Sequence, residues 1–189
     1  MGSTGFSIPY VTNSRDGPLA AIQVRAAAGR PSRGWLTVDG QTIPVALGRG
    51  GIRANKREGD GGTPKGVFQP VRLWWRADRH PRPSTFLPVR PITPRDAWCE
   101  DPADRHYNQP ICLANDAAGD RLTRDDHLYD FIIEIDHNTR PRIAGRGSAV
   151  FLHLARDNFG PTAGCVAMTR PMMLRLLRRI GPRTRIEIG

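Results

Sequence analysis

The sequence predicts a mainly β fold with a helix near the C-terminus. Its 189 residues include 20 glycines and 17 prolines, a composition that favours a turn-rich β fold over a helical bundle. Short apolar runs recur between turn residues, and a helical spacing of apolar residues appears only near the end of the chain. With 39% hydrophobic and 24% charged residues, residues 1–189 suit one domain with its own core.

The first strands are expected in the N-terminal third. Residues 19–24 form an apolar run typical of a strand. The runs 35–38 and 41–47 flank Asp39-Gly40, a pair that favours the positive φ angles of a type I′ hairpin turn. A polar, glycine-rich loop follows, and a short strand is expected near 67–71.

The composition changes between about residues 72 and 112. Eight of the 17 prolines fall between Pro70 and Pro110, together with three of the four tryptophans. Proline at this density is incompatible with central strands and helix interiors, and linkers rarely carry several tryptophans. We therefore expect an ordered, lid-like insertion at about 72–112.

Three further strands are expected in the C-terminal half. Residues 129–135 give the clearest strand pattern. Residues 148–153 form a continuous apolar run, which indicates burial on both faces. Residues 185–188 close the chain as a strand.

A helix is predicted between the last two strands. Thr169 is expected to cap it, Pro171 suits its first turn, and Gly181 suits its end. One apolar face is formed at helical spacing by Met173, Leu177 and Ile180.

The net charge of +10 raises the question of a polyanionic partner. The arginines are spread along the whole chain, and the densest group, Arg175, Arg178 and Arg179, fits the solvated face of the predicted helix. We therefore expect no specific nucleic-acid partner. No apolar run is long enough for a transmembrane segment, and residues 1–7 do not resemble a Sec-type signal peptide, so an export route is left open.

The segment around His153 and Cys165 has the composition of an active site. A histidine ends an apolar strand, a Gly/Pro-rich loop follows, and a cysteine arrives twelve residues later. A histidine can take the proton of a thiol and return it to a leaving amine, and Gly164 allows close approach of substrate to backbone amides. An isolated pair at this spacing is more often a hydrogen-bonded core histidine and a small buried thiol.

The residues around His153 and Cys165 favour an active site over a buried core pair. Phe151-Leu-His and Gly160-Pro-Thr-Ala-Gly-Cys-Val-Ala-Met168 resemble the signature of the L,D-transpeptidases with a YkuD-type catalytic domain, in a proteobacterial branch. The resemblance covers most of the chain from about residue 35 and continues at Gly48–Gly51, Lys56–Asp60, Thr63–Gly66, Trp98–Pro102, Tyr107-Asn108, Leu128–Asp130 and Gly147-Ser148.

This resemblance implies a YkuD-like β-sandwich or barrel-like domain and a mechanism. Cys165 would be the nucleophile that carries a thioester, and His153 the general base and then acid. The backbone carbonyl of Leu154 would orient the imidazole, the amides of Gly164 and Cys165 would form an oxyanion hole, and Thr162 would shape the substrate pocket.

The implied function is cross-linking of peptidoglycan stems, donor and acceptor, by a monomer in the periplasm. Both 3→3 and 1→3 linkages stay open, and water as acceptor would give an L,D-carboxypeptidase or a peptidase that cleaves cross-links. The chain departs from the family pattern at two positions. Many members have glycine directly after the histidine, where this chain has Leu154, and arginine two residues after the cysteine, where it has Ala167. These departures bear on which peptide stem is bound. A non-catalytic basic cell-wall-binding module is the alternative from another class.

Further substrate contacts are expected from Tyr107, Asn108 and Trp98, although packing of the insertion onto the core explains the aromatic residues equally well. Lys56 and Glu58 are expected to lie in a solvated loop, with pairing to a substrate carboxylate or amine as the alternative.

Cys99 and Cys112 leave open a disulfide or two free thiols. The histidines and cysteines lack metal-ligand spacing and the glycine loops lack a phosphate-cradle lysine, so we expect no metal and no cofactor.

Overall fold

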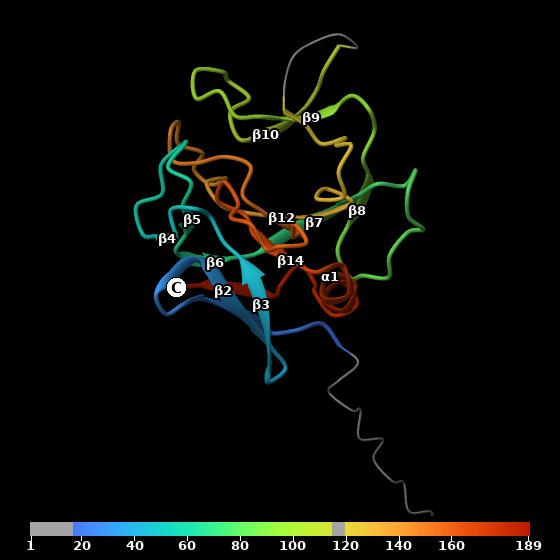
Figure 1. The fold of residues 1–189 in the computed structure, drawn as a ribbon. Coiled ribbons are helices and arrows are strands. Elements are labelled where there is room, and N and C mark those ends of the chain that lie inside the picture. The colour runs from blue at the N-terminus through green and yellow to red at the C-terminus, as the bar shows by residue number, and fades with distance from the viewer. Residues whose placement is uncertain (1–16, 115–119) are drawn as a thin grey trace, which may run out of the picture.

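The computed structural model of the protein describes residues 17–114 and 120–189, which form a curled β-sheet with a helix packed against it (Figure 1). The mainly β fold is thus confirmed. The strands are β1 (Ala21–Ala27), β2 (Arg30–Val38), β3 (Gln41–Ala46), β4 (Ile52–Arg53), β5 (Thr63–Pro64), β6 (Gly66–Phe68), β7 (Pro70–Trp75), β8 (Val89–Pro91), β9 (Asp96–Cys99), β10 (Gln109–Cys112), β11 (Asp120–Arg121), β12 (Phe131–Ile135), β13 (Phe151–Leu154), β14 (Val166–Met168) and β15 (Arg185–Ile188), and the helix is α1 (Arg170–Leu177).

Within the described residues, ten strands form the main sheet in the order β6-β15-β1-β2-β3-β14-β13-β12-β7-β8. The pairs β1–β15, β13–β14 and β7–β8 are parallel, and the other neighbours are antiparallel. A second sheet, β10-β9-β11, lies at the end of the molecule opposite the β2–β3 hairpin (Figure 1). The short pair β4–β5 is separate from both sheets.

The hairpin prediction is confirmed. Strands β2 and β3 pair antiparallel around Asp39 and Gly40, whose φ angles are +48° and +71°. These angles are those of a type I′ turn, which aspartate tolerates and glycine adopts without strain.

The predicted insertion begins later than expected. Residues 70–75 form β7, a strand of the main sheet between β12 and β8, and the side chain of Trp74 is fully buried there. Pro70 is the first residue of this strand, where proline interrupts little of the ladder, and the other prolines of the region follow Trp75. The excursion therefore leaves the main sheet after Trp75, returns briefly as β8 and then forms the second sheet.

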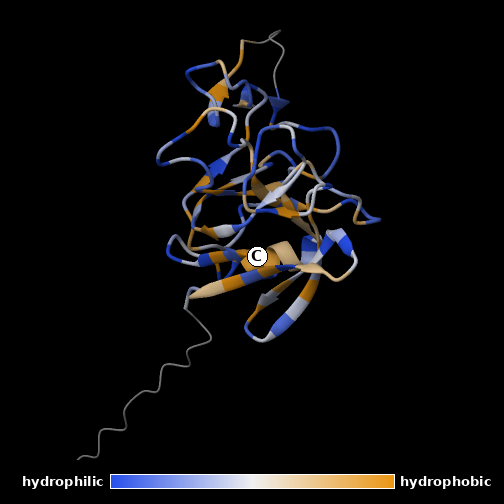
Figure 2. Cartoon of the chain, turned by 90° about the vertical axis from the view of Figure 1, so that its left-hand side faces the viewer, coloured by the Kyte–Doolittle hydropathy of each residue, from blue (hydrophilic) through white to orange (hydrophobic). Residues whose placement is uncertain are grey.

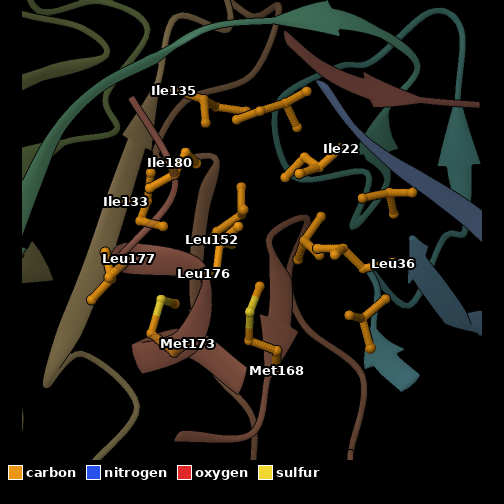
Figure 3. Close-up of a cluster of buried hydrophobic side chains, with 14 of the residues drawn as sticks. Ile22, Leu36, Ile133, Ile135, Leu152, Met168, Met173, Leu176, Leu177 and Ile180 are labelled. Atoms are coloured by element: carbon orange, nitrogen blue, oxygen red, sulfur yellow. The ribbon is translucent and has the colours of Figure 1, made fainter. Parts of the chain in front are cut away.

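The hydrophobic core fills the inside of the curl, between the main sheet and α1 (Figure 3). Leu152 on β13 and Ile133 on β12 are fully buried, as the apolar runs of these strands predicted, and all four residues of β13 are buried. Ile22 and Leu36 close the core from β1 and β2. Figure 2 shows that the loops around the second sheet, at the end of the molecule opposite the β2–β3 hairpin, are largely hydrophilic.

The predicted helix is present but shorter. Thr169 occupies the N-cap position without a side-chain capping hydrogen bond, and α1 ends at Leu177 instead of near Gly181. Its apolar face is as expected, because Met173 and Leu177 are fully buried against the sheet, as is Ile180 just beyond the helix. The helix thereby covers the face of β13 that carries Leu152, opposite to the face that carries Phe151.

Candidate active site

The pairing of β13 with β14 brings His153 and Cys165 together. The strands are parallel, with Leu152 opposite Val166 and His153 opposite Ala167, so Cys165 is level with Phe151. Side chains alternate between faces along a strand, and directly paired residues share a face. Phe151, His153 and Cys165 therefore lie on one face, while Leu152 and Val166 point into the core.

The thiol of Cys165 is buried, with 6% of the residue exposed. It donates a hydrogen bond to the carbonyl of Ala149 at 3.2 Å and accepts one from the Phe151 amide at 3.3 Å. Burial raises the pKa of the thiol to about 12, although the Phe151 hydrogen bond works in the opposite direction. Cys165 is therefore a neutral thiol at neutral pH in this state.

The imidazole of His153 is held through its Nδ1 atom, which lies 2.8 Å from the carbonyl oxygen of Leu154. A carbonyl only accepts, so Nδ1 carries the proton and Nε2 keeps its lone pair. Burial lowers the pKa of His153 to about 4, and the bond to Leu154 offsets part of this effect. The ring of Tyr129 packs edge-on against the imidazole with centroids 5.4 Å apart. His153 is thus neutral and oriented, in the form that a general base requires.

The loop before the cysteine is fixed by Thr162. Its hydroxyl donates to the Cys165 carbonyl at 2.7 Å and accepts from the Gly164 amide at 3.1 Å. Gly164 has a φ of +154°, and a Cβ atom there would lie 2.9 Å from the carbonyl oxygen of Gly62. Only glycine fits this conformation and this close backbone approach.

A polar cavity of about 350 Å³ opens onto these residues. The sequence-predicted residues Cys165, His153, Thr162 and Gly164 all contribute to its wall. Charged side chains of both signs complete it: Arg49, Lys56, Arg124, Arg156, Glu58, Glu100 and Asp120. A cavity with separate cationic and anionic groups suits a ligand that carries both carboxylates and amines.

Two of the charged groups have unusual surroundings. Loss of solvent at the cavity wall raises the pKa of Glu100 to about 7, and the charges of Asp120 and Glu58 add to this effect. Lys56, expected in a solvated loop, is instead buried, and its ammonium donates to Asp60 and to the Arg57 carbonyl at 2.7 Å each. The expectation was wrong because the glycines around the site leave room for the lysine stem, whose Cγ would lie 2.9 Å from a Cβ at Gly147.

Three of the predicted substrate contacts lie elsewhere. Trp98, Tyr107 and Asn108 are each less than 5% exposed, and the cavity wall around Cys165 does not include them. Trp98 and Asn108 line a different cavity of about 530 Å³. All three make hydrogen bonds or ring contacts within the protein, and Trp98 packs edge-on against Phe151.

Sequence reasoning missed several residues of this site. Tyr129 and Glu100 lie within stretches that carried the family resemblance, so a signal for them existed in the sequence. The same holds for Arg49 in Gly48–Gly51, whereas Arg124 gave no signal beyond its charge. The partner of the thiol is the backbone of Ala149, and no side-chain motif can reveal it.

Cys99 and Cys112 are both free thiols. In the β9–β10 ladder Cys99 is opposite Gln109 and Cys112 is opposite Asp96, so the two cysteines are three positions apart along the strands. This offset corresponds to about 10 Å, beyond the span of a disulfide.

Among the described residues, no group of three or more His, Cys, Asp or Glu side chains is arranged to hold a metal ion. In the same part of the chain, no helix combines the length and apolar character needed to cross a membrane.

The chain was compared with known protein families, curated proteins and solved structures. The family model of the YkuD L,D-transpeptidase catalytic domain matches residues 24–188, a range that includes the main sheet except for the first three residues of β1, together with the excursion and α1. No curated protein and no solved structure gives a significant match to the chain.

Proposed function

The chain belongs to the family of L,D-transpeptidase catalytic domains, and on this premise we propose that it cross-links peptidoglycan stems through a thioester on Cys165. The observation that carries the proposal is the placement of the Cys165 thiol and the oriented His153 imidazole on one face of the β13–β14 pair, at the wall of a polar cavity. The cell envelope is the setting of this family, and we place the protein in the periplasm, where its substrate lies.

The first half-reaction forms the thioester. The Cys165 proton passes to Nε2 of His153, and the sulfur attacks the carbonyl on the L side of an L,D peptide bond in the donor stem. The C–N bond then breaks, His153 returns the proton to the departing amine, and the terminal D-residue leaves. Leu154 keeps Nδ1 protonated throughout, because its carbonyl oxygen lies 2.8 Å away.

The developing oxyanion needs donors beside Cys165. We assign this role to the backbone amides of Cys165 and Gly164. The Gly164 amide already donates to the Thr162 hydroxyl at 3.1 Å, a bond that an oxyanion can replace because charged acceptors bind more strongly.

The second half-reaction resolves the thioester. A neutral amine of the acceptor stem attacks the thioester carbonyl and gives a proton to His153. The C–S bond then breaks, and His153 returns that proton to the departing thiolate of Cys165. The acidic part of the cavity wall, Glu100 with Asp120, suits an ammonium group, and the arginines suit carboxylates. Water in place of the amine makes the same site a carboxypeptidase, and the position of the acceptor amine decides between 3→3 and 1→3 linkages.

The test is incubation of the protein with purified muropeptides, with products resolved by mass spectrometry. Dimeric products that have lost a terminal D-residue are expected, and their fragmentation identifies the linkage. Shortened monomers without dimers would reassign the protein as a hydrolase.

Cys165→Ala is the matched control, and the loss of turnover is expected to be on the order of 10⁴-fold or more. If Cys165→Ala has unchanged activity in this assay, the cysteine mechanism is wrong. If neither protein converts muropeptides and both bind peptidoglycan equally, the protein is a binding module.

A further inference from the structure

The excursion holds the turn that precedes β13. Two consecutive residues of the excursion bind two residues of that turn: the Gly147 amide donates to the Tyr107 hydroxyl at 3.0 Å, and the Ala149 amide donates to Asn108 Oδ1 at 3.2 Å. Ser148, between them, donates to Glu58 at 2.7 Å. Residues 147–149 are thus held by side chains that come from two distant parts of the chain.

Every polar atom of the Asn108 side chain is occupied. Oδ1 also accepts from Trp98 Nε1 at 3.1 Å, and Nδ2 donates to the carbonyls of His137 and Asn138 at 3.0 Å each. Asn108 itself is 4% exposed. A buried amide with four such bonds has one orientation available, which fixes the position of the Ala149 amide.

Ala149 is in an unusual backbone conformation. Its φ is +49°, in the left-handed region that alanine seldom adopts, so surrounding contacts must maintain it. This conformation directs the Ala149 carbonyl to the thiol of Cys165 at 3.2 Å. Asn108 therefore binds the amide of the same residue whose carbonyl accepts the hydrogen bond of the Cys165 thiol.

The consequence is a thiol that rests away from its base. Within residues 17–114 and 120–189, the hydrogen bonds of the Cys165 sulfur are those with Ala149 and Phe151, and none joins it to His153. Transfer of the proton to His153 therefore requires the thiol to leave the Ala149 carbonyl first. Ala149 lines the cavity, so a donor stem that enters meets the residue that holds the thiol.

We propose that Asn108 is a positioning residue that, through Ala149, holds the Cys165 thiol protonated and turned away from His153 until substrate fills the cavity. The effect on catalysis rests on the proposed role of Cys165 as nucleophile. The hydrogen bond between the Cys165 thiol and the Ala149 carbonyl does not depend on that role, so the positioning role of Asn108 and the proposed function can be tested separately.

The direct readout is the S–H stretching band of Cys165, measured by infrared difference spectroscopy against Cys165→Ser at a pH where the thiol is protonated. This subtraction removes the bands of Cys99 and Cys112. Asn108→Gly deletes the side chain without backbone strain, because Asn108 has a φ of +54°. In this variant, the S–H band of Cys165 is expected to move to the frequency of a weakly bonded thiol. Alkylation of Cys165 by iodoacetamide is expected to accelerate about fivefold, because the thiol form loses the stabilisation of about one neutral hydrogen bond.

Thr93→Val is the matched control. Thr93→Val loses the 2.8 Å bond from Thr93 to Asp96 in the same excursion, so it loosens the excursion without touching the turn, and the band is expected to stay unchanged.

Two results would overturn the proposal: an unchanged band in folded Asn108→Gly, or an equal shift of the band in Thr93→Val. If Asn108→Gly does not fold, Asn108→Ser replaces it, because the shorter hydroxyl does not reach Ala149, and the same outcomes apply. These spectra are independent of turnover. Loss of muropeptide turnover in Cys165→Ala with an unchanged band in Asn108→Gly would leave the proposed function standing and remove only the positioning role.

Discussion

At the scale of single residues, the site depends on Thr162 as much as on the two reactive groups. Its hydroxyl is the only side-chain group seen to bond both the Cys165 carbonyl and the Gly164 amide within the described chain. It therefore fixes the backbone on both sides of the Gly164–Cys165 peptide unit, where the proposed oxyanion donors lie.

Substitution of Thr162 by valine tests this role. Thr162→Val keeps the shape of the side chain and leaves two buried backbone groups unpaired, at an expected cost of about 1–3 kcal/mol in the free energy of unfolding. Turnover of muropeptides is expected to fall more than their binding, because the donors act on the transition state. Thr162→Ser, which keeps the hydroxyl, should resemble the unsubstituted protein, and equal losses in both variants would argue against the hydroxyl.

The pKa of His153 predicts how stability depends on pH. The pKa is about 4 in the folded protein against an ordinary value of 6.5, so between these values the unfolded chain binds a proton that the folded protein excludes. The free energy of unfolding should therefore fall as pH drops through this interval, by an amount on the order of 3 kcal/mol at its lower end. Urea unfolding at a series of pH values measures this.

Other groups titrate in the same interval, so the comparison with His153→Gln isolates the histidine. The difference between the two proteins should depend on pH only below the ordinary histidine pKa. A constant difference across the whole range would mean that His153 is not buried in its neutral form.

At the scale of elements, α1 contributes through its apolar face and not through its caps. Its N-cap residue makes no side-chain bond, and eight residues are too few for a helix that is stable alone. Its stability comes from the core contacts of three buried side chains, Met173, Leu176 and Leu177.

Met173→Ala tests that dependence. Deleting a fully buried methionine side chain is expected to cost about 2–5 kcal/mol in the free energy of unfolding, measured by chemical denaturation. Arg178→Ala, on the exposed side of the turn that ends the helix, should change it by no more than about 0.5 kcal/mol. Comparable effects of the two substitutions would contradict the packing described for α1.

Elements that depend on neighbouring residues were predictable from the sequence, and elements that depend on pairing between distant segments were less predictable. The Asp39-Gly40 turn and the apolar face of α1 follow from neighbouring residues, and both predictions are confirmed. The composition places residues 72–75 of strand β7 in the excursion, whereas their position in the sheet is set by pairing with β12, about 60 residues away. The same limit applies to the site: the sequence pointed to His153 and Cys165, but the contact of the thiol with the Ala149 carbonyl exists only in the folded backbone.

At the scale of the whole molecule, the fold does not depend on covalent cross-links. The three cysteines are free, and the register of β9 and β10 separates two of them by three positions. Stability must come from the core inside the curled sheet and from the pairing that connects its first and last strands, β1 and β15.

Reducing agents are therefore expected to leave thermal stability unchanged. The midpoint of thermal unfolding should be the same with and without dithiothreitol, and denaturation followed by alkylation without reductant should modify three thiols. Modification of Cys165 alone, together with a lower midpoint under reducing conditions, would show that Cys99 and Cys112 are joined.

Cys112 is exposed whereas Cys99 and Cys165 are buried, so Cys112 can be labelled selectively. A polar maleimide dye should attach to Cys112 in the native protein and spare Cys99 and Cys165. The dye would then sit on β10, in the same excursion that carries Asn108, without any engineered substitution. Fluorescence from this position could follow the excursion as a peptide stem enters the cavity and leaves it.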